Sequence, residues 1–321
     1  MIKKLAVALA LIAASLSSAH AETVKLGLQP WLGYGPLWVA EEKGFFKKHN
    51  VDVVLTTFNW DQDMTAALAS GNLNVIASAT NAMITNYNQK VDQKGFLIMD
   101  LSFEADAIIA GKDISSVKDL KGKKVAFEAG ATSDLLINFA LKENGMTIAD
   151  LEHVPMGASE AGLALIAGRV DAAVTYEPYI STALAQGAGN KMIYTAAEKP
   201  GLIGDMLTAS SEWINANPND VQGLIMAWDD AINFIRANPE EGKAMIAKAV
   251  GSPMAEFEPA FKGVRLYNVK ENVEALKGEF QATLQTVGEI LHATNPDNIK
   301  TVPVPADLLS LDALNAVAAK Q

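Results

Sequence analysis

The side chains that could do chemistry in this 321-residue chain are acids, hydroxyls and aromatic rings placed at predicted turns. Two acid pairs, Asp61/Asp63 and Glu104/Asp106, are close enough in sequence to be considered as a general acid and base. Each pair has i, i+2 spacing beside a predicted element boundary, and for Asp61 and Asp63 helix capping is the better interpretation. These acids therefore do not by themselves predict catalysis.

Sequence motifs for catalysis and metal binding are absent. The chain has no cysteine, no G-x-S-x-G, no H-E-x-x-H, no Walker loop and no G-x-G-x-x-G after a strand. His49, His153 and His292 each stand apart from an acid or nucleophile at metal or triad spacing. We therefore predict no catalytic residue, no metal and no cofactor, and the lack of cysteine excludes disulfides.

An aromatic turn over residues 29–37 follows the alternating strand predicted over 23–28. Its two prolines and two glycines fix or free the backbone, so that Trp31 and Tyr34 can stand out from the strand end. Gly33 lies between them. Such a turn can form a ligand-facing wall, and the alternative is that both rings only plug the rim of a core.

Three further predicted strands end in polar residues that lead into helices. Thr80 and Asn81 follow the third strand, near 73–77, and Thr132 and Ser133 follow the strand over 125–128. Tyr176 and Glu177 follow the strand over 170–175. Ligands of open α/β sheets bind beyond the carboxyl ends of the strands, so we expect these turns to face one crevice. The Thr132–Ser133 turn has the alternative role of only capping its helix.

The N-terminus has the pattern of a secretory signal peptide over residues 1–21. Lys3 and Lys4 precede an apolar run over 5–16, and Ala19-His20-Ala21 gives a small-residue cleavage site. The pattern predicts that the mature protein is exported. No later apolar segment is long enough to span a bilayer, so the mature chain is not expected to be membrane-embedded.

Length and charge limit the architecture and the partners. About 300 mature residues exceed what one core usually serves, which predicts two lobes. The chain has 37 acidic and 26 basic residues, and two of the lysines belong to the leader. This acidity argues against nucleic acid and anionic membranes as partners.

Four phrases, together with the leader, resemble the periplasmic solute-binding proteins of ABC importers. They lie at residues 36–46, 67–71, 119–125 and 168–173. The similarity is to the nitrate, taurine and aliphatic-sulfonate group, which also includes binders of thiamine-pyrimidine precursors. It implies an α/β, two-lobed, type II periplasmic-binding-protein fold, with a mixed sheet in each lobe and two crossover strands as the hinge.

The resemblance also implies boundaries and partners. Lobe 1 would comprise residues 22–109 plus 203–321, and lobe 2 residues 110–202. The protein would be a monomer that captures a small-molecule solute between its lobes and delivers it to the permease of an ABC transporter.

Position by position, the resemblance puts the ligand shell on the four strand-end turns already described. Its residues are Trp31, Gly33, Tyr34, Thr80, Asn81, Thr132, Ser133, Tyr176 and Glu177. The two crossover strands that the resemblance implies would put Glu104, Asp106 and Asp205 at or beside the hinge. Asp106 is included as a candidate ligand contact, although such acids could instead brace the hinge.

The positions of the arginine residues indicate which kind of solute the protein would bind. Arg169, Arg236 and Arg265 are the only arginines, and none is on a predicted pocket turn. Acids and aromatic rings suit an amine, an amidine-like group or a nitrogen heterocycle. We therefore expect a nitrogen-containing solute, including zwitterions such as taurine. The alternatives are an enzyme of the thiamine-pyrimidine synthesis type on the same fold and a sensory ligand-binding module.

Overall fold

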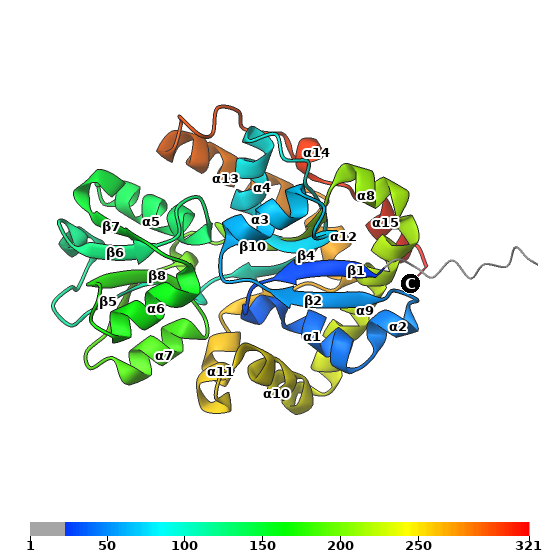
Figure 1. Ribbon diagram of the computed structural model, residues 1–321, viewed down its shortest axis with the longest axis horizontal. Helices are drawn as coiled ribbons and strands as arrows, with labels where there is room; N and C mark the ends of the chain where they lie inside the picture. Colours follow the sequence, from blue (N-terminus) through cyan, green and yellow to red (C-terminus); the bar gives the residue numbers. More distant parts are fainter. Residues whose placement is uncertain (1–22, 321) are drawn as a thin grey trace, which may run out of the picture.

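The computed structural model describes residues 23–320, which form two α/β lobes side by side (Figure 1). The leader expected over residues 1–21 lies outside this range. Lobe 1 is built on a six-stranded sheet with the spatial order β11 (Val264–Leu266), β4 (Lys94–Ser102), β10 (Ile203–Ala209), β3 (Val75–Ala79), β1 (Val24–Leu28) and β2 (Val53–Thr57). Lobe 2 is built on a five-stranded sheet with the order β7 (Glu152–Pro155), β6 (Lys124–Phe127), β8 (Ala172–Tyr176), β5 (Asp106–Ala110) and β9 (Lys191–Thr195). The predicted fold class is confirmed.

Both sheets are mixed. In lobe 1, β1 is parallel to β2 and β3, whereas β10 is antiparallel to β3 and β4. In lobe 2, β6 is parallel to β7 and β8, whereas β5 is antiparallel to β8 and β9. All residues of β3, β5, β8 and β10 are buried, because helices cover both faces of each sheet.

The chain crosses between the lobes twice. It leaves lobe 1 after β4 and enters lobe 2 at β5, and it returns through residues 196–202 between β9 and β10. The boundary expected after residue 109 is wrong at this point, because all five residues of β5 pair with β8 in the sheet of lobe 2. The first crossing is therefore residues 103–105, and Asp106 opens the first strand of lobe 2.

The helices follow the same division, with short 3-10 turns (η) at several loops. Those of lobe 1 are η1 (Leu32–Tyr34), α1 (Gly35–Glu42), α2 (Phe45–Lys48), α3 (Asp61–Ala69), α4 (Thr80–Asn88), α8 (Ser211–Ala216), α9 (Pro218–Ala237), α10 (Pro239–Val250), α11 (Met254–Phe261), α12 (Val269–Ala275), α13 (Glu279–Thr294), α14 (Pro305–Leu308) and α15 (Asp312–Ala318). Those of lobe 2 and the return crossing are η2 (Val117–Leu120), α5 (Thr132–Glu143), η3 (Ile148–Asp150), α6 (Ala158–Ile166), α7 (Tyr179–Gln186) and η4 (Ala196–Glu198). No helix within residues 23–320 has the length and apolar character needed to cross a membrane.

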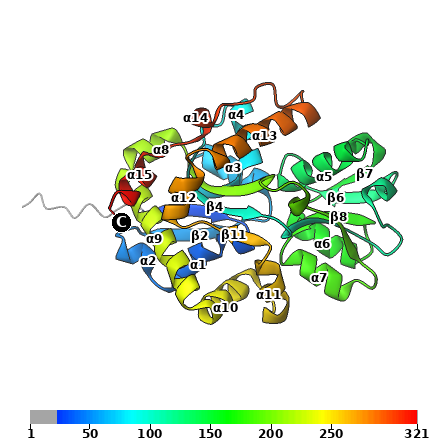
Figure 2. The ribbon, with the colours of Figure 1, turned by 180° about the vertical axis from the view of Figure 1, so that it is seen from behind.

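The helices after β10 wrap lobe 1 and also reach lobe 2 (Figure 2). The long helix α9 starts with Pro218 at its first position and packs one apolar face on α1, α2, α10 and α15. Further along the chain, α11 contacts α7, and α13 contacts α5. Two separate helices after β10 therefore touch lobe 2.

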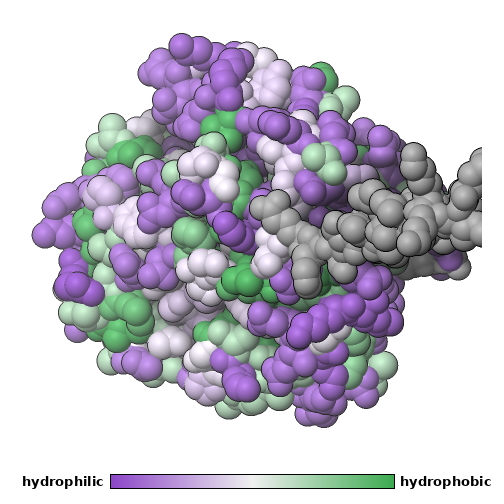
Figure 3. Space-filling view, turned by 45° about the vertical axis from the view of Figure 1, so that its right-hand side comes forward, coloured by the Kyte–Doolittle hydropathy of each residue, from purple (hydrophilic) through white to green (hydrophobic). Residues whose placement is uncertain are grey.

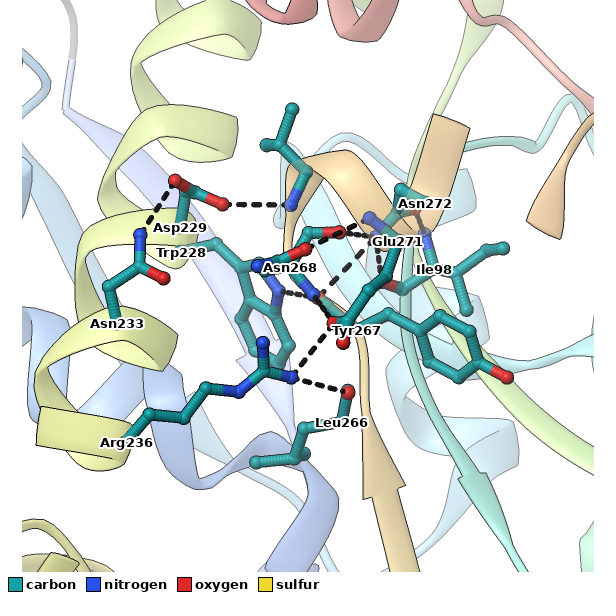
Figure 4. Close-up of polar contacts among 11 residues, drawn as sticks. Ile98, Trp228, Asp229, Asn233, Arg236, Leu266, Tyr267, Asn268, Glu271 and Asn272 are labelled. Carbon is teal, nitrogen blue, oxygen red and sulfur yellow. Dashed lines mark hydrogen bonds and ion pairs between the residues drawn. The ribbon is translucent and has the colours of Figure 1, made fainter. Parts of the chain in front are cut away.

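A buried polar network holds this C-terminal region onto β4 (Figure 4). The fully buried Asn272 side chain accepts from Ile98 N at 2.6 Å and donates to Ile98 O at 2.9 Å. Trp228 Nε1 donates to Tyr267 O at 2.8 Å. Arg236 adds an ion pair to Glu271 at 2.8 Å. The network fixes α9 and α12 against β4, whose far end leads into the first crossing.

Candidate functional site

A narrow cavity lies between the lobes, where the strand ends of both sheets meet. Its volume is about 30 Å³, counted as the space that the centre of a water molecule can occupy. The lining residues are Gln29, Trp31, Tyr34, Asp61, Asp106, Ala131, Thr132, Ser133, Ala158, Thr175, Tyr176, Ile203 and Asp205. Both lobes contribute, so a solute in this cavity would be enclosed between them.

Aromatic rings from both lobes form one wall of the cavity. Trp31 of lobe 1 meets Tyr176 of lobe 2 edge to face, with ring centroids 5.8 Å apart and an interplanar angle of 84°. Tyr176 in turn meets Tyr179 at 5.5 Å. Trp31 and Tyr34 are each 4% exposed and also belong to the main apolar core. The two roles weighed for these rings, core plug and cavity wall, are therefore combined.

Gly33 supports the site from behind the cavity wall. A Cβ atom at this position would lie 2.1 Å from Asp100 Oδ2 and 2.3 Å from Trp31 Nε1. Only glycine lets Trp31 Nε1 donate to the two carboxylate oxygens of Asp100, at 3.2 and 3.3 Å. Gly33 is not among the lining residues, and its absent side chain is what allows the ring to be positioned.

A carboxyl pair lies on two adjacent strands of the lobe 1 sheet. Asp100 of β4 and Asp205 of β10 are direct cross-strand neighbours, and Tyr34 Oη donates to Asp205 Oδ1 at 3.2 Å. Burial raises the pKa of Asp100 to about 7. Burial and the adjacent Asp100 charge raise the pKa of Asp205 well above its usual value. Like charges this close cannot both ionise freely, so the pair tends to hold a proton.

Two more carboxyl groups face the cavity from either side. Asp106, the first residue of β5, is 7% exposed, and burial followed by the charge of Asp205 raises its pKa to about 8, although the nearby Ser102 hydroxyl lowers it. Asp61 is half-buried at the start of α3, and burial raises its pKa to about 6. The capping interpretation of Asp61 is wrong: the N-cap residue is Trp60, and no side chain caps this helix from that position.

Lobe 2 brings the N-terminus of α5 to the cavity. The N-cap residue Ala131 offers no capping side chain, and Thr132 and Ser133 are the first helical residues. The Ser133 hydroxyl accepts from Glu128 N at 3.0 Å, and Tyr176 Oη has no hydrogen-bond partner although Tyr176 is only 6% exposed. Ser159 is a polar neighbour of that phenol, without a hydrogen bond of normal geometry. A buried phenol without a partner is a polar group that a ligand can satisfy.

The structure brings six of the ten predicted site residues to the cavity: Trp31, Tyr34, Asp106, Thr132, Ser133 and Tyr176. Gly33, Thr80, Asn81 and Glu177 do not line it. Glu177 instead accepts hydrogen bonds from Ser181 N at 3.0 Å and Ser181 Oγ at 2.9 Å, at the start of α7. Thr80 and Asn81 are buried in the first turn of α4, where Asn81 Oδ1 accepts from Thr132 Oγ1 at 3.4 Å across the lobes.

Among the hinge acids, Glu104 is exposed, whereas Asp205 lines the cavity. Sequence reasoning missed Gln29, Thr175 and, above all, Asp61 and Asp100 as parts of the site. A signal existed for Asp100, since it interrupts the apolar run of residues 96–101 in a strand that is otherwise buried. A charge at such a position needs a special environment.

The ionisable side chains that line the cavity are acids and phenols, and burial disfavours their charged forms. No lysine, arginine or histidine is among the lining residues, whereas three of them are aspartates. Within residues 23–320 no three histidine, aspartate or glutamate side chains are grouped so that they could hold a metal ion. The site can therefore offer carboxylates, aromatic faces, hydroxyls and the α5 N-terminus to a small solute.

Several named proteins are similar to this chain. A protein of Brucella abortus, named as a binding protein, is 27% identical over 242 residues, which is 74% of each chain. The taurine-binding periplasmic protein of Escherichia coli is 22% identical, over 80% of this chain and 82% of its own. The 4-amino-5-hydroxymethyl-2-methylpyrimidine phosphate synthase THI13 of Saccharomyces cerevisiae is 24% identical, over 68% and 67%.

Solved structures share the fold. The alkanesulfonate-binding protein SsuA of Xanthomonas axonopodis pv. citri, bound to MOPS, matches with a TM-score of 0.75 and 16% identity, over 91% of this chain and 99% of its own. The periplasmic nitrate-binding protein NrtA of Synechocystis PCC 6803 matches with a TM-score of 0.74 and 16% identity, over 94% and 89%.

The family comparison covers well over half of the chain. Residues 32–242, from the aromatic turn through both crossings into α10, match the model described as "NMT1/THI5 like". The matched segment contains most of the cavity-lining residues. The chain belongs to the NMT1/THI5-like family.

Proposed function

We propose that this protein is a solute-binding protein that captures a small nitrogen-containing organic solute between its lobes and delivers it to the permease of an ABC importer. The observation that carries the proposal is the interlobe cavity, in which acids and aromatic rings from both lobes surround one small volume. The names of the E. coli and B. abortus relatives support a binding role. With the leader predicted at residues 1–21, the mature protein would act in the periplasm as a monomer.

The test is ligand-induced stabilisation across a panel of amines, amidines, sulfonates, taurine and aminopyrimidines. A ligand that binds only the folded protein stabilises it by RT ln(1 + [L]/Kd), or about 2.7 kcal/mol at a hundred times Kd, which corresponds to a shift of several degrees in melting temperature. Mass spectrometry of the purified protein under native conditions would detect a solute that co-purifies. Failure of every panel member, with no co-purifying solute, would count against the proposal.

An enzyme is the second candidate, since THI13 is a synthase. The histidines that such chemistry would need are used elsewhere. His49 lies 2.6 Å from Asp230, His153 stacks on Phe127 at 3.7 Å, and His292 Nδ1 lies 2.7 Å from Ile299 O. None of the three lines the cavity. Turnover of a bound pyrimidine precursor, lost on His153→Ala, would favour the enzyme.

A sensory ligand-binding module would use the same cavity and differ in its partner. Reconstitution with the permease encoded nearest to this chain would separate the two roles. Solute-stimulated ATP hydrolysis by the transporter supports delivery, whereas its absence with a ligand-loaded protein supports the sensory role.

A further inference from the structure

The charge and hydrogen-bonding state of the cavity restrict what it can hold. Asp61, Asp106 and Asp205 line it from three different segments, α3, β5 and β10, and no basic side chain lines it. Tyr34 Oη donates a hydrogen bond to Asp205 Oδ1, and the Ser102 hydroxyl is the polar neighbour of the Asp106 carboxyl. Buried carboxylates without a counter-charge are costly, and a cation among them would offset that cost.

The helix N-termini that reach the cavity do not reverse this charge. The helices α3, α5 and α6 all begin at lining residues, and a helix N-terminus favours an anion. Each of these helices, however, carries its own acid in the first turn: Asp61 and Asp63 in α3, Asp134 in α5 and Glu160 in α6. Of these acids only Asp61 lines the cavity, where a simple anion would meet it and no positive side chain.

The size and shape of the cavity restrict the solute further. The cavity is narrow, because the centre of a water molecule can reach only about 30 Å³ of it, and it therefore suits a small solute. Its aromatic wall is made by Trp31, Tyr34 and Tyr176, and ring faces of this kind favour a flat cation over a bulky one. The unpartnered Tyr176 Oη is an available acceptor for an N–H group.

We propose that the solute is a small planar organic cation of the guanidinium or amidinium type, an inference that rests on the proposed function. Its N–H groups would donate hydrogen bonds to Asp61, Asp106 and Asp205. A planar array of N–H donors pairs with carboxylates through two parallel hydrogen bonds and also stacks on aromatic rings. Three acids on three segments surround such a donor set from several sides. An alkylammonium would point its three donors in one direction only.

Guanidinium, urea and nitrate provide a direct test, because the three ions or molecules have the same planar shape and nearly the same size but carry charges of +1, 0 and −1. Titration calorimetry of the full mature protein at pH 8 should show binding of guanidinium. We expect urea to bind at least about tenfold more weakly, since it lacks the charge-assisted hydrogen bonds, and nitrate not to bind at all. Tetramethylammonium, a cation that is not planar, should bind more weakly than guanidinium.

Variants locate the binding. Asp106→Asn and Asp61→Asn should each lower the affinity for guanidinium by about tenfold or more while changing that for urea much less. Asp63→Asn is the matched control, because Asp63 is an exposed acid in the same first turn of α3 that does not line the cavity. Circular dichroism would show whether each variant is folded. If Asp106→Asn does not fold, Asp61→Asn alone tests the contribution of the acids to binding.

The outcomes separate this inference from the transport role. The inference would be overturned, with a solute-binding role left in place, if another ligand bound more tightly than guanidinium and acetamidinium. The ligands to compare are nitrate, taurine, an alkanesulfonate, tetramethylammonium, Ca²⁺ and Zn²⁺. No binding of guanidinium or acetamidinium at a few millimolar would also overturn it. Loss of guanidinium binding in Asp63→Asn to the same degree as in Asp61→Asn would show that the cavity is not the site.

Discussion

At the residue scale, the position of Trp31 depends on the side chain that Gly33 lacks. Trp31 Nε1 and the Asp100 carboxylate occupy the space where a Cβ of residue 33 would stand. The backbone at Gly33 thus lies against Trp31 and Asp100, and Asp100 pairs with Asp205, which Tyr34 contacts. This explains why a residue that does not line the cavity can control it.

Gly33→Ala should therefore separate Trp31 from Asp100. We expect a loss of roughly 1–3 kcal/mol in the free energy of unfolding from overpacking, and weaker binding of any solute that contacts Trp31. Urea denaturation and ligand titration measure the two effects. Gly278→Ala is the control, since a Cβ there meets nothing within 4 Å. Equal effects of the two substitutions would refute the packing argument.

The acids also predict how stability depends on pH. Burial raises the pKa of Asp61 to about 6 and that of Asp106 to about 8, so each folded-state pKa lies above its unfolded value near 4. Between those values the folded state binds more protons than the unfolded state, and stability falls as pH rises. The ligand-free protein should therefore melt at a higher temperature at pH 5 than at pH 8.

Asp106→Asn should remove part of that slope, raising the melting temperature at pH 8 by a few degrees and changing it little at pH 4. Asp63→Asn should leave the slope as it is. Melting curves over pH 4–9 check both variants. A pH slope unchanged by Asp106→Asn would mean that this carboxyl is not among the groups that titrate on folding.

At the element scale, a carboxylate of lobe 2 caps a helix of lobe 1. Glu128, which follows β6, accepts from Gln62 N at the start of α3 at 3.3 Å, and Gln62 Nε2 donates to Ala129 O at 3.0 Å. Burial and the charge of Asp61 raise the pKa of Glu128 to about 8. This contact exists only while the lobes are together, and so it favours closure.

Glu128→Ala should shift the lobes toward separation. Loss of a helix cap costs about 1 kcal/mol, which corresponds to a several-fold lower affinity for a solute that binds the closed form. Small-angle X-ray scattering should give a larger radius of gyration for this variant. Glu152→Gln, at an exposed acid on β7, is the control. An unchanged radius together with unchanged affinity would show that this cap does not hold the lobes.

The network around Asn272 gives a prediction for lobe 1 alone. Asn272→Leu would leave Ile98 N and O without partners in a buried place, at a cost of about 2–4 kcal/mol in the free energy of unfolding. Chemical denaturation measures this, with Asn298→Ala, at an exposed loop position, as the control. A cost below that of the control would mean that water replaces the lost bonds.

At the scale of the whole molecule, the surface is acidic as well as the cavity. The full chain has a formal net charge of −11, and Figure 3 shows hydrophilic residues over much of one face, with hydrophobic ones in smaller areas among them.

A negative protein attracts a cation from a distance, and salt screens that attraction. The association rate of guanidinium should fall as salt rises to about 0.5 M, while that of urea should stay constant. Stopped-flow fluorescence of the tryptophans tests this, and a rate that rises with salt would contradict it.

The sequence predicted the architecture well because its signals are local. Chain length and the family resemblance indicated the two lobes. Alternation, glycine and proline placement, and strand-end polar residues identified the turns that carry Trp31, Thr132 and Tyr176. It could not show the direction of individual side chains. Glu177 was expected at the ligand and instead caps α7, whereas Asp61 was taken as a cap and instead lines the cavity. The Glu177 contact is local, with Ser181 four residues further along the chain, and the sequence did not favour it over a ligand contact. The place of Asp61 depends on how α3 packs against lobe 2, which no local pattern encodes.

The positions of Asp106 and Asp205 along the chain have a mechanical consequence. Asp106 is the first residue after the outgoing crossing, and Asp205 lies just after the return crossing. Both charges therefore sit close to the pivot about which the lobes would turn. A small movement of these carboxyl groups toward a solute near the hinge would rotate the lobes, and the same rotation would produce a much larger displacement at the far ends of the lobes. Charge neutralisation inside the cavity would thereby be transmitted to the outer ends of the lobes.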